Sequence, residues 1–368
     1  MARECLTFRV ATSDPGDTKG IDRLIATGQL APSEITAIFG KTEGNGGVND
    51  FTRALATEAL KSCLARHLGI TPEAVAERIP LVMSGGTEGG LSPHFLVIAA
   101  RATNTKPDGM ALAVGAGFTR AFLAEEIGRA VMVREVAKAV TDAIAAAGIA
   151  GAKDAHFVQI KCPLLTGERV EAAKARGQSV VTEYTYPSMG YSRGASALGI
   201  AVALGEIAPE RITDKAIGND FALWSGVAST SAGVELERCE IIVLGNSAAW
   251  AGDSIIAHGV MQDAIDLPAV QTVLAELGLK SAGQLDAAQQ GRVRAVLAKA
   301  EASRDGRIRG QRHIMLDDSD INATRHARAL VGGALAGLFG FTDLYVSGGA
   351  EHQGPDGGGP LAIIAAKR

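Results

Sequence analysis

Three serine-containing turns recur along the chain, and their residue types suit acyl-transfer chemistry. Each follows the pattern Ser-small-Gly-x-Glu, at residues 84–88, 231–235 and 347–351. Serine is a poor nucleophile at neutral pH unless a neighbouring base accepts its proton. The chain has seven histidines, but none recurs with the turns, whereas a lysine does. The pattern therefore indicates a serine nucleophile with lysine as its base.

A lysine precedes each turn, at the end of an apolar stretch. These residues are Lys41, Lys161 and Lys299. Lysine acts as a base only when its pKa falls well below about 10.4, through burial or through neighbouring cations. We expect the lysines to share one pocket with arginines, because the mutual repulsion of these cations lowers the lysine pKa values.

An arginine opens an alanine-rich stretch between each lysine and the following serine. The three are Arg53, Arg193 and Arg325. Residue types that cap helices precede them at 49–50, 191–192 and 322–324, so we expect each arginine near a helix N-terminus. Guanidinium groups and the N–H groups of the turns suit carbonyl oxygens and the negative charge that develops on them during acyl attack. The set predicts a small ligand with three carbonyls.

The order lysine, arginine, serine occurs three times, which indicates internal repeats. Each repeat predicts a helix, a lysine strand, an arginine helix and a serine strand. The predicted strands cover 35–39, 79–83, 157–160, 293–297 and 344–346, and the predicted helices 21–27, 54–60, 131–147, 195–204, 267–277 and 327–335. Residues 294–299 also suit a helix, and the strand before Ser231 is weakly marked. The predicted fold class is α/β, with repeat units at 1–105, 112–250 and 255–368.

The composition excludes several other classes of protein. A hydrophobic content of 47% and a mean hydropathy of +0.15 allow large buried cores. A net charge of −4 argues against a protein that binds nucleic acid or a membrane surface. The sequence has no apolar run long enough to span a bilayer and no signal-peptide pattern, so we expect a cytoplasmic protein. Its four cysteines are far apart in sequence, which argues against a disulfide framework or a zinc site.

Competing catalytic motifs do not fit the sequence. Residues 39–42 resemble the end of a phosphate-binding loop, but Ile35 stands where that loop needs its first glycine. There is no Gly-x-Ser-x-Gly elbow in a triad context, no Ser-x-x-Lys and no His-Glu-x-x-His. The glycine-rich run at 348–359 has carbonyl oxygens that suit a hard cation, but on the residues alone a tight terminal loop is the simpler interpretation.

Longer strings around these residues resemble the cyanuric acid amidohydrolase and barbiturase family. They lie at 40–46, 83–89, 189–199, 258–261, 317–322, 324–328 and 346–355, in order along nearly the whole chain. The resemblance implies three similar α/β repeat units around a pseudo-threefold axis, with the active site at the centre. It also implies hydrolysis of a ring amide bond, in which cyanuric acid gives carboxybiuret and then biuret and CO₂.

The resemblance assigns roles to residues of this chain. Ser231 would be the nucleophile and Lys161 its base, with Lys41 and Lys299 as electrostatic support. The substrate contacts would be Arg53, Ser84, Gly85, Arg193, Ala232, Arg325, Ser347 and Gly348. A structural Mg²⁺ or Ca²⁺ with no catalytic part would use Glu301, Ala350, Gln353, Gly354, Pro355 and Gly358. No organic cofactor is implied, and the expected assembly is a homotetramer.

Three other functions stay open at this point. Barbiturase activity, which opens barbiturate to ureidomalonate, is the nearest, because both rings carry three exocyclic carbonyls. A binding or sensing protein could use the arginines without turnover, although Ser231 and Lys161 argue against it. The last alternative is a metal-dependent hydrolase that uses the C-terminal loop.

Overall fold

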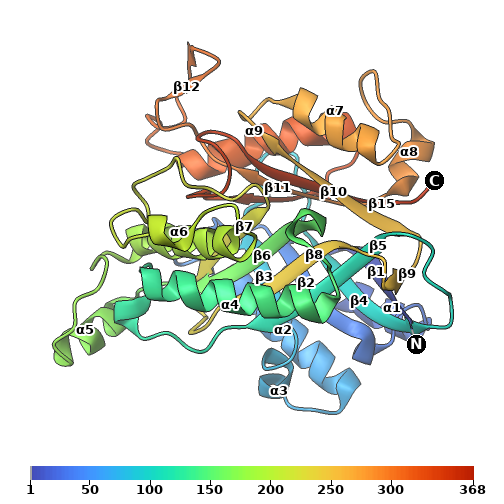
Figure 1. The fold of residues 1–368 in the computed structure, drawn as a ribbon, viewed down its shortest axis with the longest axis horizontal. Coiled ribbons are helices and arrows are strands. Elements are labelled where there is room, and N and C mark those ends of the chain that lie inside the picture. Colours follow the sequence, from blue (N-terminus) through green and yellow to red (C-terminus); the bar gives the residue numbers. More distant parts are fainter. Residues whose placement is uncertain (1) are drawn as a thin grey trace.

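The computed structural model describes residues 2–368 and contains three large sheets with helices packed on their outer faces (Figure 1). The first sheet consists of β1 (Ala2–Ala11), β2 (Ile35–Thr42), β3 (Leu81–Gly85), β4 (His94–Thr103) and the short β9 (Trp250–Ala251). The second consists of β5 (Ala111–Phe118), β6 (Ala155–Pro163), β7 (Ala228–Gly233) and β8 (Glu240–Ser247). The third consists of β10 (Ser254–Met261), β11 (Val293–Ala300), β14 (Tyr345–Gly348) and β15 (Gly359–Ala366), and β12 (Arg307–Ile308) and β13 (Gln311–Arg312) form a separate hairpin.

The three sheets share one strand order. It runs β3-β2-β4-β1, β7-β6-β8-β5 and β14-β11-β15-β10. In each sheet the lysine strand pairs in parallel with the serine strand on one side and antiparallel with the last strand on the other. Equivalent residues of the three sheets therefore occupy equivalent positions.

Each sheet is covered by helices from its own part of the chain. The helices are α1 (Lys19–Ala26), α2 (Phe51–Leu68), α3 (Pro72–Ala76), α4 (Ala130–Ala147), α5 (Gly167–Ala175), α6 (Thr185–Ala203), α7 (Leu267–Glu276), α8 (Ala287–Arg292) and α9 (Ala323–Phe339). Helix α2 packs on β2 and β3, α4 and α6 cover the second sheet, and α7 and α9 cover the third (Figure 1). The inner faces of the three sheets are therefore left to pack against one another.

Local capping explains where two of the three arginine helices begin. The Asp50 carboxylate accepts a hydrogen bond from the N–H of Thr52 at the start of α2, and the Asn322 side chain does the same for Thr324 in α9. Both helices end at a glycine in the left-handed conformation. These two predicted starts are confirmed.

The predicted start of the middle arginine helix is wrong. Helix α6 begins at Thr185, so Arg193 lies in its interior rather than near its N-terminus. Pro187 does not prevent this early start, because proline is tolerated in the first helical turn. Gly194 inside α6 has a packing reason, since a side chain there would collide with the His352 ring.

The strands resolve two open points of the sequence. Residues Val293–Ala300 form a strand, not a helix, and the weakly marked segment before Ser231 is strand β7. The sequence pattern missed the first and last strand of every sheet, such as β5 and β8. Of these, β4, β8 and β15 are the antiparallel neighbours of the lysine strands, and β1, β5 and β10 pair with them on the other side.

A central core joins the three sheets. It is built on the second sheet with α4 and α6, and it includes Phe39 from the first sheet and Leu297 and Tyr345 from the third. The edge of the Tyr345 ring meets the Phe39 ring with centroids 5.3 Å apart. Separate clusters fill the spaces under α2 and under α7 and α9. Among the helices of residues 2–368, none is both long and apolar enough to cross a bilayer.

Candidate active site

The three lysines face the three serines across parallel strands. The strand registers pair Lys41 with Ser84, Lys161 with Ser231, and Lys299 with Ser347. Residues paired in this way carry side chains on the same face of a sheet. The order of residues seen in the sequence thus becomes the same Lys–Ser geometry in all three sheets.

The lysines also connect the sheets in a closed ring. The Nζ of Lys41 donates to the carbonyl of Val346 at 2.8 Å, that of Lys161 to Met83 at 2.8 Å, and that of Lys299 to Thr230 at 2.9 Å. Each acceptor is the residue immediately before the serine of another sheet. The three serine strands are therefore held next to one another by buried ammonium or amine groups.

A small inner cavity lies where the serine strands meet. It is lined by Gly46, Arg53, Ser84, Gly85, Lys161, Met189, Arg193, Ser231, Ala232, Arg328, Ser347 and Gly348. This set contains both predicted catalytic residues and every predicted substrate contact except Arg325. Lys41 and Lys299 lie behind the lining and reach it through Ser84 and Ser347.

Arg325 lies outside the inner cavity. Its side chain is 41% exposed and its Nε donates to Glu88 at 3.1 Å. The inner position belongs to Arg328, one turn further along α9, whose side chain is only 4% exposed. Residues three apart share one face of a helix, so the sequence pattern did not distinguish the two. The structure makes the choice through the turn glutamate Glu88, which Arg328 binds through both carboxylate oxygens.

An outer cavity of about 460 Å³ leads to the inner one. Both cavities share Gly46, Met189, Arg193, Arg328 and Gly348. Arg325 and Tyr186 line only the outer part. A small molecule that enters from solvent would pass these residues first.

Two of the three arginines form closed ion pairs with turn glutamates. Arg193 donates to both carboxylate oxygens of Glu351 at 2.7 Å. Arg328 binds both oxygens of Glu88, at 2.7 Å and 2.5 Å. Burial alone would raise the pKa of Glu351, but the adjacent Arg193 outweighs it and holds this pKa at about 2. These pairs fix the arginines at the cavity wall.

The third pair is open. Arg53 donates to the carbonyls of Gly46 and Gly47, at 3.3 Å and 2.7 Å, and its buried Nε has no hydrogen-bond partner within residues 2–368. The matching glutamate, Glu235, instead lies 3.6 Å from the Nζ of Lys161. Among residues 2–368, Lys161 is therefore the one of the three lysines that forms an ion pair with a turn glutamate.

The serine hydroxyls differ in the same way. Lys41 donates to the Ser84 hydroxyl at 3.3 Å, and Lys299 donates to the Ser347 hydroxyl at 3.2 Å. The hydroxyl of Ser231 is buried and has no hydrogen-bond partner in the part of the chain that the structure describes. An unpartnered buried hydroxyl is costly unless a ligand satisfies it. Ser231 is thus the hydroxyl of the three that is left for a ligand.

Burial, more than the neighbouring cations, lowers the pKa of each lysine. Desolvation brings the pKa of Lys161 to about 8, where Glu235 opposes the shift and Arg53 adds to it. The pKa of Lys299 falls to about 7, first by burial and then by Arg193. Burial also holds the pKa of Lys41 well below its usual value. At pH 8 a large fraction of Lys161 and Lys299 is therefore neutral, which makes these two side chains usable as bases.

Four of the six predicted cation ligands surround one small cavity. They are Glu301, Ala350, Gly354 and Pro355. The Glu301 carboxylate accepts from the N–H groups of Ala302 and Ala350, and its pKa is raised by burial and then by Glu351. A buried carboxylate beside a second one and several peptide carbonyls suits a hard cation.

The other two predicted ligands lie outside this lining. The Gln353 side chain accepts from the N–H of Thr230 at 2.6 Å and donates to the Gly349 carbonyl. Gly358 donates its N–H to the Pro355 carbonyl. Gln353 therefore ties the C-terminal loop to the residue just before Ser231.

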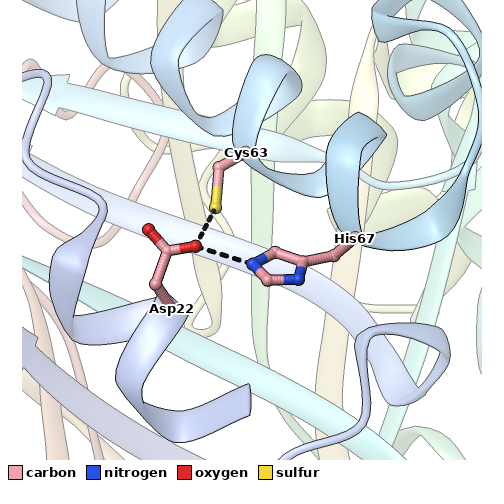
Figure 2. A group of neighbouring side chains, drawn as sticks. All are labelled: Asp22, Cys63 and His67. Carbon is pink, nitrogen blue, oxygen red and sulfur yellow. Dashed lines mark hydrogen bonds and ion pairs between the residues drawn. The ribbon is translucent and has the colours of Figure 1, made fainter. Parts of the chain in front are cut away.

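A second cluster of potential ligands lies far from the cavities, between α1 and α2. Figure 2 shows Cys63 and His67 directed at the same Asp22 oxygen, at 3.5 Å and 2.6 Å. Arg66 donates to that oxygen as well, at 2.8 Å. Burial raises the pKa of the Cys63 thiol to about 11, so it stays protonated. The cluster is best explained as a hydrogen-bond network that joins the two helices.

A buried serine hydroxyl in register with a lysine of lowered pKa has the residue types that acyl transfer to serine requires. The profile of the amidohydrolase ring-opening protein family matches residues 7–366, and the chain belongs to this family of enzymes.

Similar proteins of known name extend over almost the whole chain. The cyanuric acid amidohydrolase of Azorhizobium caulinodans is 56% identical over 359 residues, which cover 98% of this chain and 97% of that protein. The cyanuric acid amidohydrolase of Pseudomonas sp. strain ADP is 53% identical, over 97% of this chain and 98% of that protein.

Two solved structures have the same fold. One is a cyanuric acid hydrolase described as an evolutionary innovation by structural concatenation, with a TM-score of 0.95, 52% identity and complete coverage of both chains. The other is cyanuric acid hydrolase from A. caulinodans, with a TM-score of 0.91, 54% identity and 99% coverage of both chains.

Proposed function

We propose that this chain opens the ring of cyanuric acid by hydrolysis, with Ser231 as nucleophile and Lys161 as its base. The observation that carries the proposal is the free, buried hydroxyl of Ser231 in the inner cavity, paired in register with a lysine of lowered pKa. The names of the similar proteins support the choice of substrate.

The first half of the reaction forms an acyl-enzyme. Neutral Lys161 takes the proton of the Ser231 hydroxyl while Oγ attacks a ring carbonyl carbon. Negative charge then develops on the carbonyl oxygen, and arginine and turn N–H donors of the cavity stabilise it. As the ring C–N bond breaks, the ammonium of Lys161 returns the proton to the leaving nitrogen.

The second half releases the product. Lys161 takes a proton from water, whose oxygen attacks the acyl carbon, and the proton then returns to Ser231. The product is carboxybiuret, which loses CO₂ to give biuret. Protons balance over the cycle, so the proposed chemistry needs no organic cofactor.

The trigonal shape of the substrate suits three arginines. We propose that Arg53, Arg193 and Arg328 each face one of its carbonyls, with Arg328 in the role first expected of Arg325. Support comes from the three Lys–Ser registers and the ring of lysine-to-carbonyl bonds. We further propose that 1–105, 112–250 and 255–368 are three repeat units around a pseudo-threefold axis with this site at its centre.

A structural cation and a tetramer complete the proposal. Mg²⁺ or Ca²⁺ would be held by Glu301 and by the loop that contains Ala350, Gly354 and Pro355, and would neutralise the buried carboxylates. It would brace the loop from which Gln353 reaches Thr230.

Light scattering of the purified protein tests the homotetramer that the family resemblance implies.

The test of function is a comparison of two substrates. Purified protein is incubated with cyanuric acid and, separately, with barbiturate, and biuret, CO₂ and ureidomalonate are measured. Faster conversion of cyanuric acid supports the proposal. Preference for barbiturate would make the protein a barbiturase with the same Ser–Lys chemistry, and no turnover of either ring would overturn the proposal in favour of a binding protein.

A further inference from the structure

The catalytic lysine differs from its two counterparts in the partners of its Nζ. Lys41 and Lys299 each donate to their own serine. Lys161 donates to the Met83 carbonyl and lies 3.6 Å from the Glu235 carboxylate. A carboxylate thus takes the place beside Lys161 that a serine hydroxyl takes beside the other two lysines.

Glu235 is available for this contact because Arg53, its counterpart among the arginines, bonds to other groups. The glutamates at the same place in the other two turns, Glu88 and Glu351, are each bound through both oxygens by an arginine. Arg53, the arginine left for Glu235, bonds the carbonyls of Gly46 and Gly47 instead. One of three equivalent acids is therefore redirected from an arginine to a lysine.

Glu235 and Lys161 line a second cavity, distinct from the inner one. A rear cavity of about 650 Å³ is lined by Lys161, Glu235 and Glu240, together with residues of α2 and of the segment after β7. Lys161 also lines the inner cavity, whereas Glu235 does not. Lys161 is therefore common to both cavities, which places Glu235 beside the lysine and outside the lining of the inner cavity.

We propose that Glu235 is a positioning residue that completes a Ser231–Lys161–Glu235 relay. It holds the Nζ of Lys161 and stabilises the ammonium that forms when Lys161 takes the proton of Ser231. In this step the O–H bond of Ser231 breaks, an N–H bond forms on Lys161, and Glu235 stays ionised throughout. The inference rests on the Ser–Lys pair of the proposed function.

Other charged groups around Lys161 do not replace Glu235. Arg53 opposes the ammonium, and Cys162 is a buried thiol whose pKa is raised by desolvation. Glu240 is the register partner of Lys161 on β8, but burial raises its pKa to about 8, although the Leu81 N–H, Lys161 and Arg238 all lower it, so it is mostly neutral at pH 7. Burial also acts to raise the pKa of Glu235, but Lys161 and Arg53 outweigh it, and Glu235 stays ionised.

The test is the pH dependence of turnover in Glu235→Gln, with Glu58→Gln as the matched control. Glu58 lines the same rear cavity but pairs with Lys61 at the surface. Because Glu235 raises the pKa of Lys161, its neutralisation lets the neutral base persist to lower pH. We expect the acid limb of kcat to move down by about one pH unit and the plateau to fall about 10-fold or more. KM should change little, and Glu58→Gln should match the wild type.

Two further variants separate this inference from the proposed function. Glu235→Asp keeps the charge, so its acid limb should stay near that of the wild type while kcat falls less than in Glu235→Gln. Loss of activity in Lys161→Ala together with a wild-type kcat and acid limb in Glu235→Gln would overturn the relay and keep the Ser–Lys pair. Full activity in Lys161→Ala would overturn both.

If Glu235→Gln does not fold, Glu235→Asp decides the relay alone. A drop in kcat, with an acid limb at the wild-type position or below it, supports the relay, and a wild-type kcat together with a wild-type acid limb overturns it.

Discussion

The middle Lys–Ser pair and the two other pairs share strand register and a lysine-to-carbonyl bond but differ in the bonds of the serine hydroxyl. In the outer pairs, Lys41 and Lys299 bond to Ser84 and Ser347, so these hydroxyls are already satisfied. In the middle pair the Ser231 hydroxyl is unbonded within residues 2–368, and Lys161 faces Glu235. Equal strand registers therefore do not make equal sites.

The difference separates binding from chemistry. A lysine that already donates to its serine lowers the reactivity of that hydroxyl and holds it as a fixed hydrogen-bonding group. A free hydroxyl beside a lysine with a carboxylate behind it can give up its proton. We infer that two of the three sites position the ring and that one attacks it.

The largest expected effect comes from breaking the middle pair. Ser231→Ala and Lys161→Ala should each lower kcat by about 10³-fold or more, and the double variant should lose little beyond either one, because the pair acts as a unit. Steady-state assays with cyanuric acid measure this. If Ser84→Ala were inactive and Ser231→Ala active, the nucleophile would be Ser84 and our assignment would be wrong.

The next effect distinguishes the inner arginine from the outer one. Arg328→Lys removes a buried two-point contact and should lower kcat/KM by roughly 10- to 100-fold, whereas Arg325→Lys at the partly exposed outer position should stay within about threefold of the wild type. Thermal melts of both variants control for folding. The reverse ranking would restore Arg325 as the third ring contact.

Breaking an outer pair should have a moderate effect. Ser84→Ala and Ser347→Ala each remove one fixed hydrogen-bonding group from the cavity and should lower kcat/KM about 10-fold, through KM as much as through kcat. Separate measurement of the two constants tests this. A change confined to kcat would mean that these serines take part in the chemistry itself.

The smallest effect on activity is expected at the cation loop. Treatment with EDTA should lower the unfolding temperature by several degrees, because a ligand that binds only the folded state stabilises it. Initial rates at 25 °C should stay close to normal. Glu301→Gln should make the melting temperature insensitive to EDTA. Immediate loss of turnover on chelation would instead indicate a metal-dependent hydrolase.

The pattern of the chain located the lysine and serine strands, but it missed much of the framework around them. The repeated order of lysine and serine at the ends of apolar stretches marks two strands of each sheet. The parallel register of these strands then brings each lysine beside its serine. The outer strands β5 and β10 carry no chemical residues and so escaped the repeat pattern. The prediction placed Arg193 near a helix start because cap-type residues precede it at 191–192, whereas α6 begins at Thr185 and contains the glycines at 190 and 194, against which Glu351 and His352 pack.

The difference between the three sites was beyond the reach of the sequence. The turns at 84, 231 and 347 all carry a glutamate, and nothing in their spacing tells which one pairs with arginine. That choice depends on contacts between sheets, such as Arg328 with Glu88, which join residues 240 positions apart. The family resemblance implies Ser231 and Lys161, and in the structure this pair differs from the other two in its contacts.

The most direct test of the account is the site of the covalent intermediate. The wild-type enzyme is quenched in acid during turnover of cyanuric acid, digested, and examined by mass spectrometry. Attack on the ring adds all atoms of the substrate, so we predict a mass increase of one whole substrate molecule on the peptide that contains Ser231. The same adduct on Ser84 or Ser347, with Ser231 unmodified, would contradict the central claim.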